Sequence, residues 1–152
     1  MDNEFYMAEA IKEARKAYAL GEVPVGAVIV QNGEIIARAH NQVETDKAST
    51  SHAEMIAINA AENALGEKWL LDATMYVTLE PCSMCAGAMV LARIKNLVIG
   101  ASDPKTGACG SVTNIANNNE LNHRIEIETG VLEKECSEIL KCFFKERREQ
   151  NK

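Results

Sequence analysis

The sequence predicts an α/β fold in which a central sheet carries helices on both faces. Segments with the alternation typical of strands follow segments with helical spacing along the chain. Asn32-Gly33 joins the first two expected strands, because both residue types tolerate the positive φ of a two-residue hairpin turn. The chain has 152 residues, which suffice for one packed core but are cramped for two domains.

The first half of the chain is expected to form a helix, a hairpin and a second helix. Apolar residues recur at helical spacing over residues 5–18, and Gly21 marks the end of this helix. The hairpin strands cover residues 25–30 and 34–39. Alanine and isoleucine side chains then line one face of a helix over residues 53–64.

The second half continues the alternation of strands and helices. A short buried strand over residues 75–79 leads into a helix of small residues over 84–91, which is apolar on nearly all sides and therefore expected to be buried. Residues 97–99 and 125–128 are expected to be strands, and an amphipathic helix follows over residues 131–144.

A polar segment, residues 102–122, separates the last two expected strands. It is rich in Gly, Asn, Ser and Thr. A connection of this length is unusual inside a compact domain, and such loops often carry function.

Composition and charge narrow the classes of function. The formal charge of -6 argues against a protein that coats nucleic acid non-specifically. The acidic start of the chain lacks the basic and apolar regions of a secretory signal, and no run of about 18 uncharged apolar residues predicts a membrane span. Five cysteines cannot all pair internally. We expect a cytoplasmic protein whose thiols bind metal or take part in catalysis.

A local basic region lies at the end of the chain. From Lys141 to Lys152, five basic residues stand against two glutamates, a local balance of +3. Such a region attracts phosphates. It is also typical of a solvated helix end, where cations are favoured near the negative pole of the helix dipole.

Two short motifs contain residues that can bind zinc. Ser51-His52-Ala53-Glu54 stands at the start of the second expected helix, and Pro81-Cys82-x-x-Cys85 at the start of the third. Imidazole nitrogen and thiolate sulfur bind zinc well, and a helix N-terminus stabilises thiolates. A site with only these three ligands would keep one coordination position for water, as catalytic zinc sites do.

Each motif also has a simpler interpretation. The Cys-x-x-Cys pair fits a redox pair, or half of a structural zinc site completed by Cys109, Cys136 or Cys142. Ser51 and Glu54 match a capping box, in which the glutamate satisfies only a backbone amide. The combination is more restrictive, because His-x-Glu followed by Pro-Cys-x-x-Cys is the signature of zinc-dependent nucleobase deaminases. There, the glutamate moves protons beside the metal without binding it.

Further segments extend this pattern over nearly the whole chain, from about Phe5 to Arg148. They are residues 22–28, 40–41, 52–55, 76–88, 101–107, 122–124 and 143–145. Together they resemble the bacterial tRNA-specific adenosine deaminases, within the cytidine-deaminase-like superfamily. The zinc motif alone is shared with cytosine, cytidine and guanine deaminases, whereas the later loop and the basic C-terminal helix are similar to those of the tRNA enzymes.

The resemblance implies a three-layer α/β/α, cytidine-deaminase-like fold with a mixed five-stranded sheet. Residues 1–148 would form a single zinc-dependent deaminase domain, and residues 149–152 a frayed C-terminal tail. It also implies a homodimer with one Zn²⁺ per subunit, bound by His52, Cys82 and Cys85, and Glu54 as the catalytic proton shuttle. The implied reaction is the hydrolytic deamination of adenosine to inosine at the wobble position of a tRNA anticodon.

The resemblance further implies which residues bind the RNA. Asn41 would contact the nucleotide beside Ala53, although asparagine at this place is also typical of a turn after a strand. The base pocket would be walled by Val23, Pro24, Val25 and Gly26. The other expected RNA contacts lie on the polar loop and the C-terminal helix: Asp103, Lys105, His123, Phe144 and Arg147. Asp103 before a proline is also ordinary turn chemistry.

Two other functions are compatible with the sequence. A deaminase of a free base or nucleoside, such as guanine, cytosine or cytidine, would use the same metal and glutamate without a basic surface. A non-catalytic zinc-binding RNA module would bind tRNA without releasing ammonia.

Overall fold

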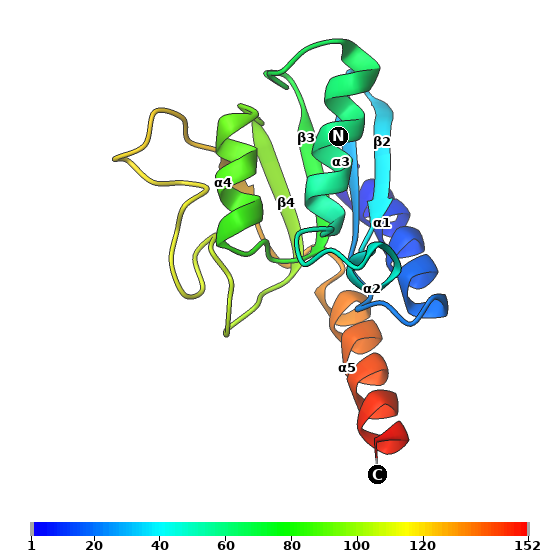
Figure 1. Ribbon diagram of the computed structural model, residues 1–152. Coiled ribbons are helices and arrows are strands. Elements are labelled where there is room, and N and C mark those ends of the chain that lie inside the picture. The colour runs from blue at the N-terminus through cyan, green and yellow to red at the C-terminus, as the bar shows by residue number, and fades with distance from the viewer. Residues whose placement is uncertain (1, 152) are drawn as a thin grey trace.

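The computed structural model describes residues 2–151 and has three layers (Figure 1). A five-stranded sheet in the order β2-β1-β3-β4-β5 lies between two pairs of helices. The strands are β1 (Gly26–Gln31), β2 (Glu34–His40), β3 (Thr74–Leu79), β4 (Asn96–Ala101) and β5 (Glu126–Glu128). β1 is antiparallel to both of its neighbours, whereas β3, β4 and β5 are parallel. The predicted α/β/α fold with a mixed five-stranded sheet is confirmed.

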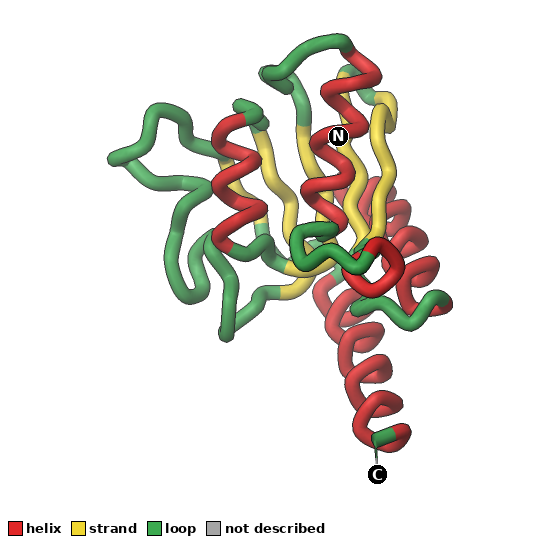
Figure 2. The backbone as a smooth tube through the Cα atoms, in the orientation of Figure 1, coloured by secondary structure: helices red, strands yellow, loops and turns green. Residues whose placement is uncertain are grey.

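The two faces of the sheet carry separate hydrophobic cores. The helices are α1 (Asn3–Ala19), α2 (Val43–Asp46), α3 (Ala53–Leu65), α4 (Ser83–Leu91) and α5 (Glu133–Gln150). α3 and α4 cover one face, and α1 and α5 the other (Figure 2). Because successive residues of a strand point to opposite faces, Ala27 and Ile29 pack on the α3 side, and Val28 and Val30 on the α1 side. Within residues 2–151, no helix is both long and apolar enough to cross a bilayer.

Local sequence signals explain where the first elements begin and end. The Asp2 carboxylate caps α1 by accepting a hydrogen bond from the Phe5 backbone N–H at 3.0 Å. Asn32 and Gly33 have φ angles of 53° and 76°, so the predicted two-residue turn between β1 and β2 is confirmed.

Two boundaries differ from the sequence prediction. The short helix α2 was not predicted, because four residues are too few to show a periodic pattern. α5 begins at Glu133 and continues to Gln150, whereas the expected helix covered residues 131–144. Arg147 and Arg148 lie in its last turn, where their positive charges are stabilised by the negative pole of the helix dipole.

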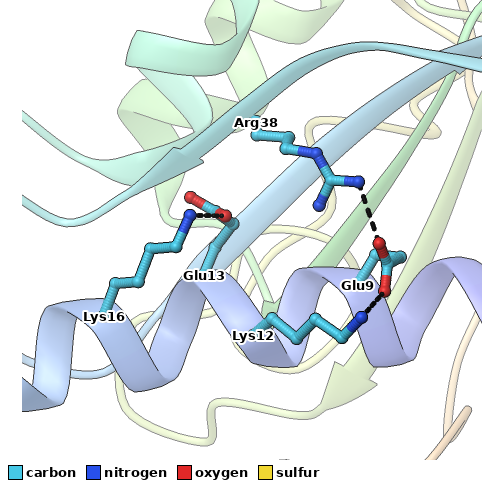
Figure 3. Close-up of polar contacts among 5 residues, drawn as sticks. All are labelled: Glu9, Lys12, Glu13, Lys16 and Arg38. Atoms are coloured by element: carbon cyan, nitrogen blue, oxygen red, sulfur yellow. Dashed lines mark hydrogen bonds and ion pairs between the residues drawn. The ribbon is translucent and has the colours of Figure 1, made fainter.

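One ion pair joins α1 to the edge strand β2, and two others lie within α1 (Figure 3). The Glu9 carboxylate accepts from Lys12 Nζ at 2.5 Å and from Arg38 Nη2 at 2.8 Å. The hydrogen bonds from Lys12 and Arg38 hold the pKa of Glu9 below its ordinary value. The neighbouring Glu13 pairs with Lys16 on α1 at 2.7 Å. Glu9 thereby links α1 to β2, whereas the pair of Glu13 with Lys16 lies within α1.

Gly26 allows α1 to lie directly against β1. A Cβ at this position would overlap the backbone of Ala10 and Ala14, and the Gly26 N–H donates to Thr78 Oγ1 at 3.1 Å. The sequence prediction placed Gly26 on the wall of a base pocket. In the structure, the position that a Cβ would occupy faces α1.

The substitution Gly26→Ala should therefore lower the free energy of unfolding by about 2–4 kcal/mol, because the overlap is with rigid backbone. Urea denaturation measures this loss. Gly33→Ala is the matched control, since its Cβ would meet no atom within 4 Å and only the positive φ is strained. It should cost about 1 kcal/mol. Equal losses in the two variants would contradict the role of close approach.

Candidate functional site

Three potential metal ligands meet where two helices begin. His52 precedes α3 and Cys82 precedes α4, each in extended backbone conformation at the N-cap position, and Cys85 lies in the first turn of α4. His52 Nδ1 is 3.7 Å from Cys82 Sγ and 3.4 Å from Cys85 Sγ. The three ligand atoms lie within 4.8 Å of one another. The fold thus joins two motifs that are about thirty residues apart in sequence.

The spacing of these atoms fits a tetrahedral zinc ion. Zn–S bonds of about 2.3 Å and Zn–N bonds of about 2.0 Å separate sulfur from nitrogen by about 3.5 Å. The two nitrogen–sulfur distances, 3.4 and 3.7 Å, bracket this value. Two thiolates and one imidazole are also a donor set that zinc prefers. The cluster can hold a metal ion without rearrangement.

No fourth ligand joins the cluster among residues 2–151. Cys109 is buried, with its Sγ 4.0 Å from the Pro81 carbonyl oxygen, and it does not belong to the group. Cys136 packs in the core between α5 and the sheet, and Cys142 is exposed on α5. A closed structural site completed by one of these thiols is therefore not supported. The arrangement is that of a site with an open position.

The two thiols differ in acidity. A hydrogen bond from Cys85 is the largest cause that lowers the pKa of Cys82 to about 5, and it outweighs burial. The backbone N–H groups of Cys85 and Met84, at the start of α4, contribute in the same direction. The shared hydrogen bond and burial raise the pKa of Cys85. Cys82 is thus a thiolate at neutral pH, and a metal ion that bound here would displace the proton of Cys85.

Glu54 lies beside the cluster in the first turn of α3. Its side chain is 4% exposed, and burial raises its pKa to about 7. The capping-box interpretation is wrong, because the N-cap residue is His52 rather than Ser51 and the His52 side chain forms no capping hydrogen bond. A carboxyl group with a pKa near neutrality can both accept and donate a proton.

A cavity of about 460 Å³ opens above the cluster. Nine of the residues expected at the site line it: Val23, Val25, Asn41, His52, Glu54, Cys82, Asp103, Phe144 and Arg147. The cavity therefore collects residues from the loop before β1, from the connection after β2, from the polar loop and from α5. Only the three-dimensional fold brings these four segments together.

Other expected site residues lie outside the cavity lining: Pro24, Gly26, Ala53, Cys85, Lys105 and His123. His123 Nε2 lies 2.6 Å from the Ile94 carbonyl oxygen, which ties the polar loop to the segment before β4. Ala53 contributes through its backbone, because its N–H donates to Asn41 Oδ1 at 3.0 Å. This bond occupies Oδ1, so Asn41 Nδ2 remains as a donor at the cavity.

Asp103 organises its own turn. Its carboxylate accepts from the Lys105 and Thr106 N–H groups at 3.0 and 3.2 Å, and from Thr106 Oγ1 at 2.8 Å. Burial raises the pKa of Asp103, but these hydrogen bonds outweigh it and hold the pKa below its ordinary value. The turn interpretation of Asp103 is confirmed.

The end of α5 closes one side of the cavity. Arg147 donates to the Gly21 carbonyl oxygen, and its guanidinium carbon is 4.9 Å from the centre of the Phe143 ring. Phe143 is buried, whereas Phe144 is 44% exposed. Arg147 therefore holds the last turns of α5 against the loop that follows α1.

Two buried glutamates at the cavity, Glu22 and Glu80, were not identified from the sequence. Glu22 accepts from the Glu44 and Thr45 N–H groups at 3.0 and 2.6 Å, and from Thr45 Oγ1 at 2.7 Å. Glu80 accepts hydrogen bonds from the polar loop. A glutamate in a short connection is normally solvated, so the sequence does not indicate that these two are buried. The one available indication is that Glu80 directly follows a buried strand.

Comparisons with known proteins agree with this site. Residues 1–148 match the MafB19-like deaminase family. The chain is 55% identical over 150 residues to a tRNA-specific adenosine deaminase of Bacillus subtilis, covering 99% of this chain and 93% of the relative. It is 49% identical over 148 residues to the tRNA-specific adenosine deaminase of Aquifex aeolicus, covering 97% of each. A solved structure from a study of A-to-I editing by tRNA:A34 deaminases at the wobble position superposes with a TM-score of 0.86 at 43% identity, over 90% of this chain and 99% of that one.

The substitution Glu22→Gln should lower the free energy of unfolding at neutral pH by about 1–3 kcal/mol, because an amide cannot accept all three hydrogen bonds. Burial raises the pKa of Glu22, but the bonds from Glu44 and Thr45 outweigh it and hold the pKa below 4.5. The contribution of a carboxylate with a lowered folded-state pKa is complete above its unfolded value and is lost as the pH falls through the folded one.

Urea denaturation of wild type and variant at neutral pH and at about pH 3 tests this linkage. The difference in unfolding free energy should shrink in acid. A difference that does not change with pH would show that the charge of Glu22 is irrelevant to its role.

Proposed function

Since the chain belongs to the family of MafB19-like deaminases, we propose that it hydrolyses adenosine to inosine at the wobble position of a tRNA anticodon. One observation carries the proposal: the buried Glu54 carboxyl lies beside the cluster of His52, Cys82 and Cys85, and Glu54, His52 and Cys82 line one cavity. The tRNA substrate is supported by the close, nearly full-length similarity to tRNA-specific adenosine deaminases.

The cofactor in this proposal is one Zn²⁺ per chain, held by His52 Nδ1 and by the sulfur atoms of Cys82 and Cys85. When bound, zinc supplies hydrolytic power by lowering the pKa of a water molecule to near neutrality. Cys82 and Cys85 give the site negative charge without a carboxylate ligand, so Glu54 is left available for proton transfer.

Glu54 acts as the proton shuttle. Its carboxylate takes a proton from the attacking water and delivers it to the adenine ring nitrogen next to the attacked carbon. Glu54 then takes the remaining proton of the added hydroxyl group and transfers it to the amino group, so that the bond to carbon breaks, ammonia leaves and the carbonyl of inosine forms. Its pKa of about 7 suits both roles, because the group exchanges protons readily near neutral pH.

The cavity walls orient the base. Val23 and Val25 present apolar surface, and Asn41 Nδ2 offers hydrogens to acceptor atoms of a purine. An anticodon loop supplies unpaired bases that can turn into a pocket. Phe144 and Arg147, at the rim, would contact the flanking nucleotides by stacking and charge.

The same proposal includes the assembly and location of the protein. Residues 1–148 act as one deaminase domain, and the chain works as a cytoplasmic homodimer. Three exposed apolar residues, which we call the α4 patch, support a partner surface: Trp69 is 45% exposed, Leu91 78% and Leu121 41%. The α4 patch lies at the C-terminal end of α4, away from the cavity at its N-terminal end.

The zinc-loaded protein should convert adenosine to inosine in an anticodon hairpin and should release no ammonia from guanine, cytosine or cytidine. The matched control is Glu54→Gln, which should keep zinc while turnover falls by about 10²–10⁴-fold. Inosine is measured after nuclease digestion, and zinc per chain by elemental analysis.

Deamination of guanine or cytidine but not of the hairpin would favour the free-base deaminase. Hairpin binding without ammonia release, unaffected by Glu54→Gln, would favour the non-catalytic RNA module. Loss of zinc in the variant would mean that Glu54 is a metal ligand.

The substitution Leu91→Glu should convert the dimer into monomers, because a desolvated, unpaired charge at an interface costs several kcal/mol. Sedimentation equilibrium measures the change. Leu20→Glu is the control, since Leu20 is 59% exposed at the end of α1, on the opposite face of the sheet, and this variant should stay dimeric. A dimer that survives Leu91→Glu would exclude the α4 patch as the interface.

A further inference from the structure

The polar loop between β4 and β5 keeps a defined shape with little regular structure of its own. Residues 102–125 form no helix or strand, and their regular pairing is limited to an isolated β-bridge between Cys109 and Asn114. It extends beyond α4 at the side of the sheet (Figure 1). Two of its residues, Asp103 and Thr106, nevertheless line the cavity. Some interaction must therefore fix the near half of this loop.

The Glu80 carboxylate provides that interaction. Oε1 accepts from the Asp103 N–H at 3.0 Å and from the Ser111 hydroxyl, and Oε2 accepts from the Cys109 and Ser111 N–H groups at 3.0 and 3.1 Å. All four donors belong to one loop. Glu80 is 4% exposed and takes part in none of the ion pairs found among residues 2–151. Its charge is thus balanced by loop amides and a hydroxyl instead of a cation.

The backbone around Glu80 joins the loop to the sheet and to the metal-binding segment. The Glu80 N–H donates to the Ala101 carbonyl oxygen at 2.9 Å, across the ends of β3 and β4. The Ala108 N–H donates to the Pro81 carbonyl oxygen at 2.9 Å, one residue before Cys82. Gly107 lies so close that a Cβ there would overlap the Glu80 carboxylate. The loop is folded tightly around this side chain.

Glu80 is not a member of the metal-ligand cluster, which comprises only His52, Cys82 and Cys85 among residues 2–151. We propose that Glu80 is a positioning residue: it fixes the backbone of residues 103–111 and thereby sets the wall of the cavity that receives the RNA. The RNA part of this inference rests on the proposed function, whereas the anchoring of the loop does not.

Two substitutions test this role, one in the Glu80 side chain and one in the loop. Glu80→Gln exchanges one oxygen for an NH₂ group, and whichever oxygen is lost, two of the four donors lose their acceptor. Gly107→Ala disturbs the same contact from the loop side. The matched control is Glu22→Gln, which removes a buried carboxylate from the other side of the cavity without touching residues 103–111.

Hydrogen exchange is followed on the zinc-loaded chain, together with zinc content and hairpin kinetics. In Glu80→Gln and Gly107→Ala, amide exchange over residues 103–111 should accelerate by about tenfold or more. KM for the hairpin should rise by about tenfold, while kcat stays within about twofold and zinc is retained. Glu22→Gln should leave exchange over residues 103–111 unchanged.

Unchanged exchange in both variants would overturn the proposal. So would a fall in kcat at constant KM, which would make Glu80 a catalytic residue, or a loss of zinc, which would make it part of the metal site. If Glu80→Gln does not fold, Gly107→Ala alone decides by the same measurements. A wild-type chain that does not act on the hairpin would refute the proposed function, whereas the exchange data would still decide whether Glu80 anchors the loop.

Discussion

The site depends on one constraint: the N-termini of α3 and α4 must begin at the same edge of the sheet. β3 leads into α4 and pairs with β1, whose partner β2 leads into α3 through residues 41–52, which include α2. His52 and Cys82 each directly precede a helix. As a consequence, His52 Nδ1 lies 3.7 Å from Cys82 Sγ. The N–H groups at the N-termini of the two helices favour negative charge at this point. The cluster of potential metal ligands, the buried Glu54 carboxyl and the cavity all follow from this meeting of helix ends.

Carboxyl groups near the cavity show how environment divides their roles. Glu22, Glu80 and Asp103 are met by several N–H donors, and their pKa values are held below the ordinary range. Glu54 is buried with fewer donors, and its pKa is raised to about 7. The first three therefore stay ionised and shape backbone, whereas Glu54 is the one placed to exchange a proton.

Local signals predicted much of this molecule. The hairpin turn at Asn32-Gly33, the alternation of strands and helices, and the two ligand motifs are readable because each depends on residues close in sequence. The anchoring roles of Glu22 and Glu80 cannot be predicted from the sequence, since their hydrogen-bond partners are backbone amides more than twenty residues away. Gly26 belongs to the same class, because its need for a bare Cα comes from Ala10 and Ala14 on another element. Contacts of this kind exist only after the chain has folded.

The position of α5 has a consequence for protein synthesis. The three potential metal ligands have all been synthesised once Cys85 has been added, but Phe143, Phe144 and Arg147, which close the cavity, lie in the later turns of α5. Domains emerge from the ribosome N-terminal part first. A nascent chain therefore contains all three potential metal ligands before it contains the side chains that close the cavity. The order of residues along the chain separates these two events in time.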